Sequence, residues 1–136
     1  MDKLSCILLV DDDKTTNFTN QMLLEDMGVT EKILIAHNGK QALEMIRQAC
    51  QQDCCPTLIL LDINMPVMNG FEFLTAYQEL AFDHKQSVVI VMLTTSLNPR
   101  DVKQMDEYPV KGFLNKPLTE AMVRELLQTH FHRDLL

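Results

Sequence analysis

The chain lacks several features that would point to particular classes of protein. No apolar run approaches the roughly 20 residues that a membrane-spanning helix needs. The first residues carry two charges ahead of a short apolar run, unlike a secretory signal. No stretch rich in proline, glycine or serine marks a linker, and no repeat or low-complexity segment occurs. We therefore expect a single cytoplasmic domain over residues 1–136 that makes no contact with a membrane.

Basic residues are also scarce. Twelve Lys and Arg stand against nineteen Asp and Glu, which gives a formal net charge of -7, and the Lys and Arg form no cluster. Because such a charge repels a polyphosphate backbone, we expect no direct binding to nucleic acid.

The chain has four cysteines, and three of them fall within six residues. They are Cys6, Cys50, Cys54 and Cys55. No second cysteine pair follows at the spacing of zinc sites. We therefore interpret all four as reduced thiols, as expected in the cytosol, and not as a metal site.

Short apolar runs alternate with segments of helical periodicity along the chain. We expect strands over residues 6–10, 33–36, 57–61, 88–93 and 112–114, and helices over residues 15–27, 40–51, 71–80, 100–107 and 120–131. The strands are continuously apolar, which is typical of strands that are buried on both faces. The pattern predicts an α/β fold in which helices cover both faces of a five-stranded parallel sheet.

Polar residues directly follow four of the predicted strands. They are Asp11, Asp12 and Asp13 after the first, Asp62 after the third, Thr94 after the fourth, and Asn115 with Lys116 after the fifth. In an open parallel sheet, the ligand crevice lies at the carboxyl ends of the strands, so these side chains should meet there.

The chemistry of these residues suits phosphoryl transfer. Clustered carboxylates raise one another's pKa unless a cation neutralises them, and Mg²⁺ is typically held by one or two carboxylates together with phosphate oxygens. We interpret Asp13 as a helix N-cap, which leaves Asp11 and Asp12 for the metal. Lys116 adds a positive charge suited to a phosphoryl oxygen, and Thr94 adds a hydroxyl donor. The sequence thus predicts a phosphoryl-transfer site that uses Mg²⁺ or Mn²⁺.

Four segments resemble the signature blocks of response regulator receiver domains. They are Leu-Leu-Val-Asp-Asp-Asp at 8–13, Leu-Leu-Asp-Ile-Asn-Met-Pro at 60–66 with Asn-Gly at 69–70, Met-Leu-Thr-Thr-Ser at 92–96, and Phe-Leu-Asn-Lys-Pro at 113–117. Thr95 stands where this family more often has alanine or serine. The resemblance spans nearly the whole chain and implies a doubly wound, flavodoxin-like sheet with strand order 2-1-3-4-5.

The resemblance also implies how the acidic residues divide their roles. Asp62 would accept a phosphoryl group from a histidine kinase or a histidine phosphotransfer protein. Asp12, Asp62 and the backbone carbonyl of Asn64 would bind Mg²⁺ directly, whereas Asp11 would act through water. The chain would thus be a signalling domain that assists its own phosphorylation and dephosphorylation, not an enzyme.

Three further roles follow from the same resemblance. Lys116 would pair with the phosphoryl group, and Thr94 would move toward it. Phe113 would be a switch aromatic that turns inward when the threonine moves, and the surface so changed would bind a downstream protein.

The first predicted helix carries an apolar pair on its outer side. At about 100° per residue, Phe18 and Met22 point away from the arc that should face the core. That inward arc consists of Thr16, Asn20, Leu23, Leu24 and Met27. Since Phe18 and Met22 are i and i+4 neighbours just after the aspartates, we expect them to form a docking patch for the phosphotransfer protein.

Two other readings compete with this one. Residues 11–15 match the Asp-x-Asp-x-Thr motif of haloacid-dehalogenase-like phosphohydrolases, and Thr94 and Lys116 could fill that family's later motifs. However, the chain lacks a cap and a late acidic pair, and residues 62–66 would stay unexplained. A pseudo-receiver that only binds partners should have lost a metal ligand or the acceptor, but this chain keeps them all.

Overall fold

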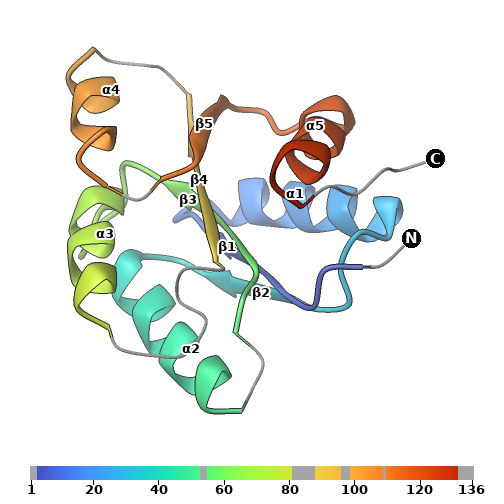
Figure 1. Cartoon of the computed structure of the whole chain (residues 1–136), viewed down its shortest axis with the longest axis horizontal. Coiled ribbons are helices and arrows are strands. Elements are labelled where there is room, and N and C mark those ends of the chain that lie inside the picture. The colour runs from blue at the N-terminus through green and yellow to red at the C-terminus, as the bar shows by residue number, and fades with distance from the viewer. Residues whose placement is uncertain (1–2, 53–54, 81–87, 96–98, 109, 132–136) are drawn as a thin grey trace.

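A computed structural model describes residues 3–52, 55–80, 88–95, 99–108 and 110–131 of the chain. In Figure 1, a central sheet carries helices on both sides. The elements are β1 (Ile7–Val10), α1 (Lys14–Met27), β2 (Ile33–Ala36), α2 (Gly39–Gln51), β3 (Leu58–Asp62), α3 (Gly70–Glu79), β4 (Val89–Thr94), α4 (Pro99–Met105), β5 (Gly112–Asn115) and α5 (Glu120–Phe131). Within the described residues, no helix is long and apolar enough to cross a membrane.

The sheet has the predicted topology. Its five strands lie in the order β2-β1-β3-β4-β5, and every pairing between neighbours is parallel. Each predicted strand and helix is present, and its ends are shifted by at most two residues. The chain passes from β1 outward to β2 and then returns across β1 to β3. The carboxyl ends of β1 and β3 therefore form the point at which the strand order reverses, where ligands bind in such sheets.

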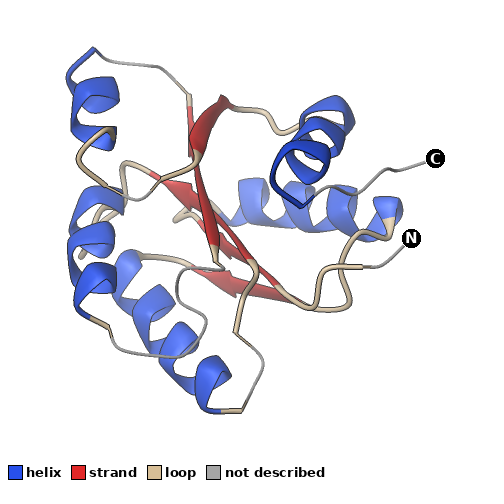
Figure 2. Ribbon diagram, viewed as in Figure 1, coloured by secondary structure: helices blue, strands red, loops and turns tan. Residues whose placement is uncertain are grey.

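Two apolar cores, one on each face, hold the helices against the sheet. Figure 2 shows the strands in red between layers of blue helices. One core packs α2, α3 and α4 against the sheet, and the other packs α1 and α5 against the opposite face. All residues of β1, β3 and β4 are buried, whereas β2 and β5 lie at the edges and are partly exposed. Burial on both faces explains why the central strands are continuously apolar.

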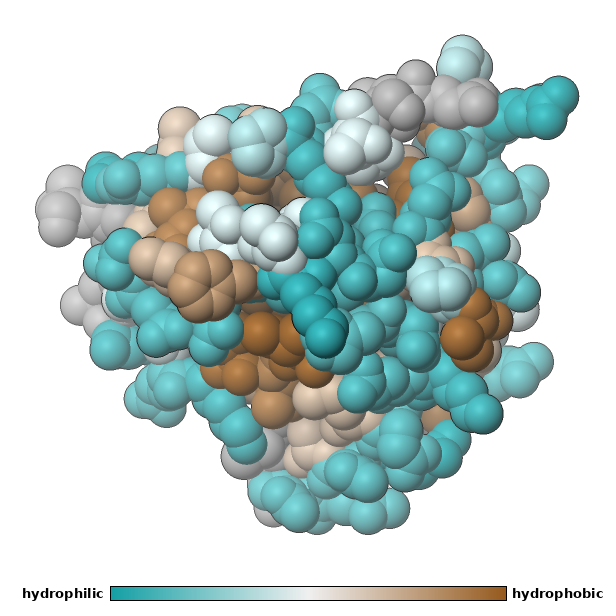
Figure 3. Space-filling view, turned by 180° about the vertical axis from the view of Figure 1, so that it is seen from behind, coloured by the Kyte–Doolittle hydropathy of each residue, from teal (hydrophilic) through white to brown (hydrophobic). Residues whose placement is uncertain are grey.

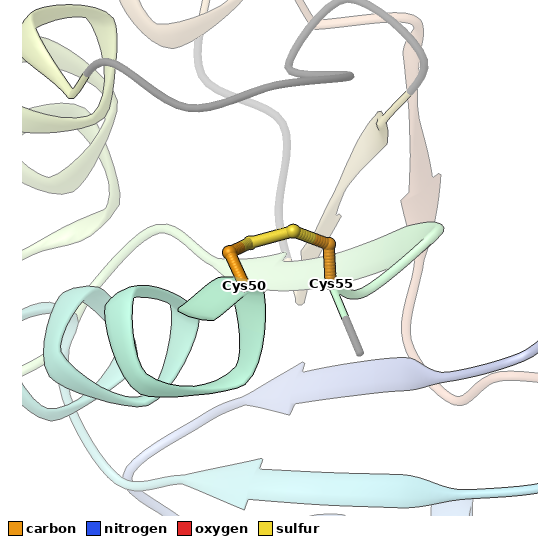
Figure 4. Close-up of a disulfide and its surroundings, with 2 residues drawn as sticks. All are labelled: Cys50 and Cys55. Carbon is orange, nitrogen blue, oxygen red and sulfur yellow. A yellow bond between two sulfur atoms is a disulfide. The ribbon is translucent and has the colours of Figure 1, made fainter. Parts of the chain in front are cut away.

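The prediction that all cysteines are reduced thiols is wrong for Cys50 and Cys55. A disulfide joins Cys50, at the end of α2, to Cys55, which precedes β3 (Figure 4). Cys6 is buried and takes no part in a disulfide, and Cys54 lies outside the described residues. The two cysteines are five residues apart in the sequence, and their Cα atoms lie 4.3 Å apart. The absence of a second cysteine pair argues against a zinc site, but it gave no signal for or against this disulfide.

Gly70 lets the loop after β3 close tightly on the end of that strand. Its N–H donates to the carbonyl of Ile63 at 2.8 Å. A Cβ at this position would lie 2.6 Å from the carbonyl oxygen of Asp62 and 3.0 Å from the Cε of Met92. Backbone cannot yield as a flexible side chain can, so only glycine fits here without moving Asp62.

Replacing Gly70 tests this close approach. We expect Gly70→Ala to lower the free energy of unfolding by about 1–3 kcal/mol, because the added methyl group overpacks the end of β3. Gly112→Ala is the matched control, since a Cβ at Gly112 would meet nothing within 4 Å. Its effect should stay within about 0.5 kcal/mol. Urea denaturation measures both, and equal losses in the two variants would contradict the account.

Candidate functional site

Three aspartates converge at the carboxyl edge of the sheet. Asp11 and Asp12 follow β1, and Asp62 is the last residue of β3. One carboxylate oxygen from each lies within 4.8 Å of the other two. Asp11 and Asp62 are buried, at 4% and 8% exposure, whereas Asp12 is exposed to solvent. The structure thus brings together side chains that are about 50 residues apart in the sequence, as the strand-end pattern predicted.

Lys116 lies between the two buried carboxylates. Its Nζ is 2.5 Å from Oδ2 of Asp11 and 3.3 Å from Oδ1 of Asp62. The lysine follows β5 directly, and its backbone N–H donates to the carbonyl of Thr94 at 2.8 Å, which ties the ends of β4 and β5 together. The ammonium of Lys116 therefore forms ion pairs with two carboxylates, which lie at the ends of two other strands.

Asp11 is held on several sides. Its N–H donates to the carbonyl of Ala36 at the end of β2. Its Oδ1 accepts the N–H of Asp13 at 2.9 Å, and its Oδ2 accepts the ammonium of Lys116. Asp62 has a looser attachment, because Lys116 lies farther from it.

Electrostatics distinguish Asp62 from an ordinary surface carboxylate. The pKa of Asp62 is raised to about 6, first by burial and then by the negative charge of Asp11, although Lys116 acts in the opposite direction. Burial by itself would lower the pKa of Lys116, but the hydrogen bond and charge of Asp11 and the charge of Asp62 raise it overall. Lys116 is thus held as a cation, and the carboxylates of Asp11 and Asp62 share its one positive charge.

This excess of negative charge suits a divalent cation. The donor atoms are carboxylate oxygens alone, which hard cations such as Mg²⁺ and Mn²⁺ prefer over softer metals. Asp12 lies on the solvent side, and Asp11 and Asp62 form the buried side. The arrangement can therefore take up a cation from solvent without breaking the core.

Asp13 is the N-cap of α1, as predicted. Its side chain accepts the N–H of Thr15 at 3.0 Å and the hydroxyl of Thr16 at 2.9 Å. These hydrogen bonds, that of Thr16 first, lower the pKa of Asp13. The reading of residues 11–15 as a phosphohydrolase motif requires Asp13 in the reacting group, but its carboxylate is occupied with starting the helix.

The remaining predicted residues lie on β4, β5 and α1 and in the loop after β3. Thr94 is buried at the end of β4, and Asn64 is exposed two residues after Asp62. Phe113 lies on β5 with 41% of its surface exposed, beside a cavity of about 180 Å³ between β5 and α5. On α1, Phe18 and Met22 are exposed as predicted, at 62% and 50%.

Asn17 is a residue that the sequence analysis missed. It is 2% exposed, and its Nδ2 donates to the backbone carbonyl of Asp11 at 2.9 Å. The signal was present, because Asn20 was placed on the inward arc of the helix and Asn17 lies one turn before it. A polar side chain on the inward arc of a helix is expected to have a hydrogen-bond partner, because buried polar groups are rarely left without one.

Val67 holds a strained backbone in the loop that follows β3. Its φ is 68°, in the left-handed region that a β-branched residue rarely adopts, and 76% of its surface is exposed. The N–H of Met68 donates to the carbonyl of Pro66 across it, closing a tight turn. Such strain is often found in loops at functional sites.

The topology and the acidic cluster define a class of protein. A flavodoxin-like order of parallel strands, with carboxylates from β1 and β3 and a lysine after β5 at one edge, is the arrangement expected of receiver domains. Comparison with known proteins agrees. The family model for the response regulator receiver domain matches residues 7–128. The chain belongs to this family, the receiver domains of two-component response regulators.

Similar proteins include whole regulators and kinases. Two-component response regulator 24 of Arabidopsis thaliana is 30% identical over 120 residues, which cover 88% of this chain and 79% of the plant protein. Hybrid signal transduction histidine kinase B of Dictyostelium discoideum is 33% identical and covers 96% of this chain, which spans only 7% of that kinase. A two-component response regulator from Cytophaga hutchinsonii has a similar solved structure, with a TM-score of 0.87, 27% identity, and coverage of 97% and 100% of the two chains.

The raised pKa of Asp62 predicts how stability depends on pH. Asp62 ionises near pH 3.8 in the unfolded chain and near pH 6 in the folded chain, so ionising it costs stability as the pH rises through this window. With divalent cations removed, Asp62→Asn should raise the free energy of unfolding by about 1–3 kcal/mol above pH 6 and lose this advantage near pH 4.

Urea denaturation from pH 4 to 8 measures this difference, with the exposed Asp12→Asn as the control. A gain for Asp62→Asn of the same size at every pH would contradict the assignment.

Proposed function

We propose that this chain is a phospho-accepting receiver in which Asp62 takes a phosphoryl group from a histidine kinase or a histidine phosphotransfer protein. The observation that carries the proposal is the single ammonium of Lys116, held between the buried carboxylates of Asp11 and Asp62. The ammonium of Lys116 could therefore form a charge-assisted hydrogen bond with a phosphoryl oxygen bound beside Asp62.

Among the three aspartates, Asp62 is best suited to form the bond. Asp11 is tied by hydrogen bonds to Asp13 and Lys116, and Asp12 is exposed to solvent. Asp62 is buried and more loosely attached to Lys116, and its pKa of about 6 leaves it ionised at neutral pH. It is therefore a carboxylate that is shielded from water and able to attack.

The reaction asks mainly for positioning and charge. A carboxylate oxygen of Asp62 forms a bond to phosphorus, the bond from phosphorus to the imidazole nitrogen of the donor breaks, and its electron pair stays on that nitrogen. Lys116 would pair with a phosphoryl oxygen, and the hydroxyl of Thr94 would donate to another. Asp12, Asp62 and the carbonyl of Asn64 would hold Mg²⁺ or Mn²⁺, with Asp11 acting through water. When bound, the cation neutralises the carboxylate and phosphoryl oxygens.

The role of the domain follows from this chemistry. Residues 1–136 would act as one receiver unit in the cytoplasm, and the family match over residues 7–128 supports that extent. The unit would assist its own phosphorylation and dephosphorylation and signal to a downstream protein, without turning over another substrate.

The exposed apolar pair on α1 is the proposed docking patch for the phosphodonor. Figure 3 shows the molecule from behind, with hydrophobic areas within a mostly hydrophilic surface, and Phe18 and Met22 are 62% and 50% exposed. Phe18 lies about one turn into α1, which starts directly after the aspartates, and Met22 lies one turn further along. An aromatic beside a flexible methionine at the rim of the site suits contact with a helical hairpin.

Phe113 is the proposed link between the site and a partner surface. It pairs in register with Met92, two residues before the pairing of Thr94 with Asn115. A movement of Thr94 toward a phosphoryl group therefore acts on a strand directly bonded to the strand of Phe113. The cavity beside Phe113 gives its ring space, so the surface of α4, β5 and α5 can change.

Labelling tests the acceptor. Acetyl phosphate with Mg²⁺ should add one phosphoryl group to the chain, and intact mass should show it. Asp62→Asn should abolish labelling, whereas Asp13→Asn, which keeps a helix N-cap, should be labelled like the parent. Labelling of Asp62→Asn at the parental rate would exclude Asp62 as the acceptor.

Comparison of two donors tests the docking patch. Phe18→Ala should slow transfer from the cognate phosphohistidine protein by about 5- to 30-fold, the effect of losing a central apolar contact. It should leave labelling by acetyl phosphate unchanged, and Gln128→Ala, an exposed change on α5, should alter neither rate. If both donors slow equally in Phe18→Ala, the residue supports the fold and not docking.

Beryllofluoride, which mimics a bound phosphoryl group, tests the switch. With Mg²⁺ it should shift the NMR signals of the Phe113 ring and of α4, β5 and α5, because Thr94 moves and the ring turns inward. Thr94→Val should bind the mimic yet lose the distant shifts. Shifts confined to the acidic cluster in the parent would count against this coupling.

A further inference from the structure

The buried face of α1 is unusually polar near the acidic cluster. Its fully buried residues are Asn17, Asn20 and Leu24, so two of the three are amides. A buried amide is unfavourable unless it is hydrogen-bonded, which makes the partners of these side chains informative.

Asn17 is only half satisfied. Its Nδ2 donates to the backbone carbonyl of Asp11, six residues earlier and across the loop between β1 and α1. Its Oδ1 is buried and has no hydrogen-bond partner within the described part of the chain. Leaving one group of a buried amide unpaired offsets what the other gains, so the side chain adds little to stability as such. The orientation is nevertheless fixed, because a flipped amide would set its oxygen against the carbonyl of Asp11.

The bond from Asn17 completes the restraint on the Asp11 peptide. The N–H of Asp11 is held by Ala36, and its carbonyl is held by Asn17, so both sides of the residue are anchored. The carboxylate of Asp11 in turn receives the N–H of Asp13 and the ammonium of Lys116. The direction of the chain at Asp11 also sets where the next residue, Asp12, presents its carboxylate.

We propose that Asn17 is a positioning residue that fixes the Asp11–Asp12 segment in the geometry needed to bind a divalent cation with Asp62. This inference rests on the proposed function, because it assumes that the acidic cluster takes up Mg²⁺. Replacing a residue that hydrogen-bonds to a metal ligand without touching the metal typically weakens metal binding by about 10- to 100-fold.

The test is Asn17→Leu in the full chain, which keeps the size of the side chain and removes both amide groups. Calorimetry should show that Mg²⁺ binds about tenfold more weakly, while the midpoint of thermal unfolding without metal stays close to that of the parent. The amide of Asp13, which bonds to Asp11, should exchange its hydrogen faster in the variant.

Asn20→Leu is the matched control, because it also removes an amide that is 5% exposed, one turn further along the same helix. It should leave the Mg²⁺ affinity unchanged. If Asn17→Leu does not fold, Asn17→Ala replaces it with the same expected loss of affinity. Unchanged affinity in the Asn17 variant, or equal losses in the Asn17 and Asn20 variants, would overturn the positioning role while leaving the receiver proposal in place. A parent chain that binds no Mg²⁺ would overturn both.

Discussion

Two buried carboxylates that share one ammonium are the interaction on which the site depends. Asp11 and Asp62 come from adjacent strands whose other residues are apolar and buried, so their charges are poorly solvated. Lys116 neutralises only part of this charge, and the pKa of Asp62 stays raised. The remaining negative charge is what favours a divalent cation and, with it, a phosphoryl group. The apolar sheet thus provides both the support and the low solvation that give these residues their chemistry.

The surrounding loops serve to keep this charge cluster in place. Asp13 starts α1 and so removes its own carboxylate from the cluster, while Gly70 lets the loop after β3 lie against the backbone of Asp62. Asn17 reaches back from α1 to the carbonyl of Asp11. Each contact is local, and each restrains one of the strand ends. In the loop after β3, Val67 has a φ of 68°, a backbone conformation that is unfavourable for a β-branched residue.

The sequence was informative where a rule of periodicity or topology applies. Continuously apolar runs predicted β1, β3 and β4, and the helical arc predicted that Phe18 and Met22 are exposed. The rules were weaker for single contacts. The burial and hydrogen bond of Asn17 were not predicted, and Cys50 and Cys55 were predicted to be thiols.

Sequence alone therefore determined the order of elements, the sheet topology through its resemblance to receivers, and the set of residues at the strand ends. Such properties follow from patterns that repeat along the chain, since parallel strands must place their carboxyl ends together. Only the tertiary structure decided that Lys116 lies closer to Asp11 than to Asp62, and that Asn17 holds the Asp11 carbonyl. Lys116 is 105 residues from Asp11 in the sequence, and Asn17 reaches Asp11 from the first turns of α1, so the packing of the whole domain sets both contacts.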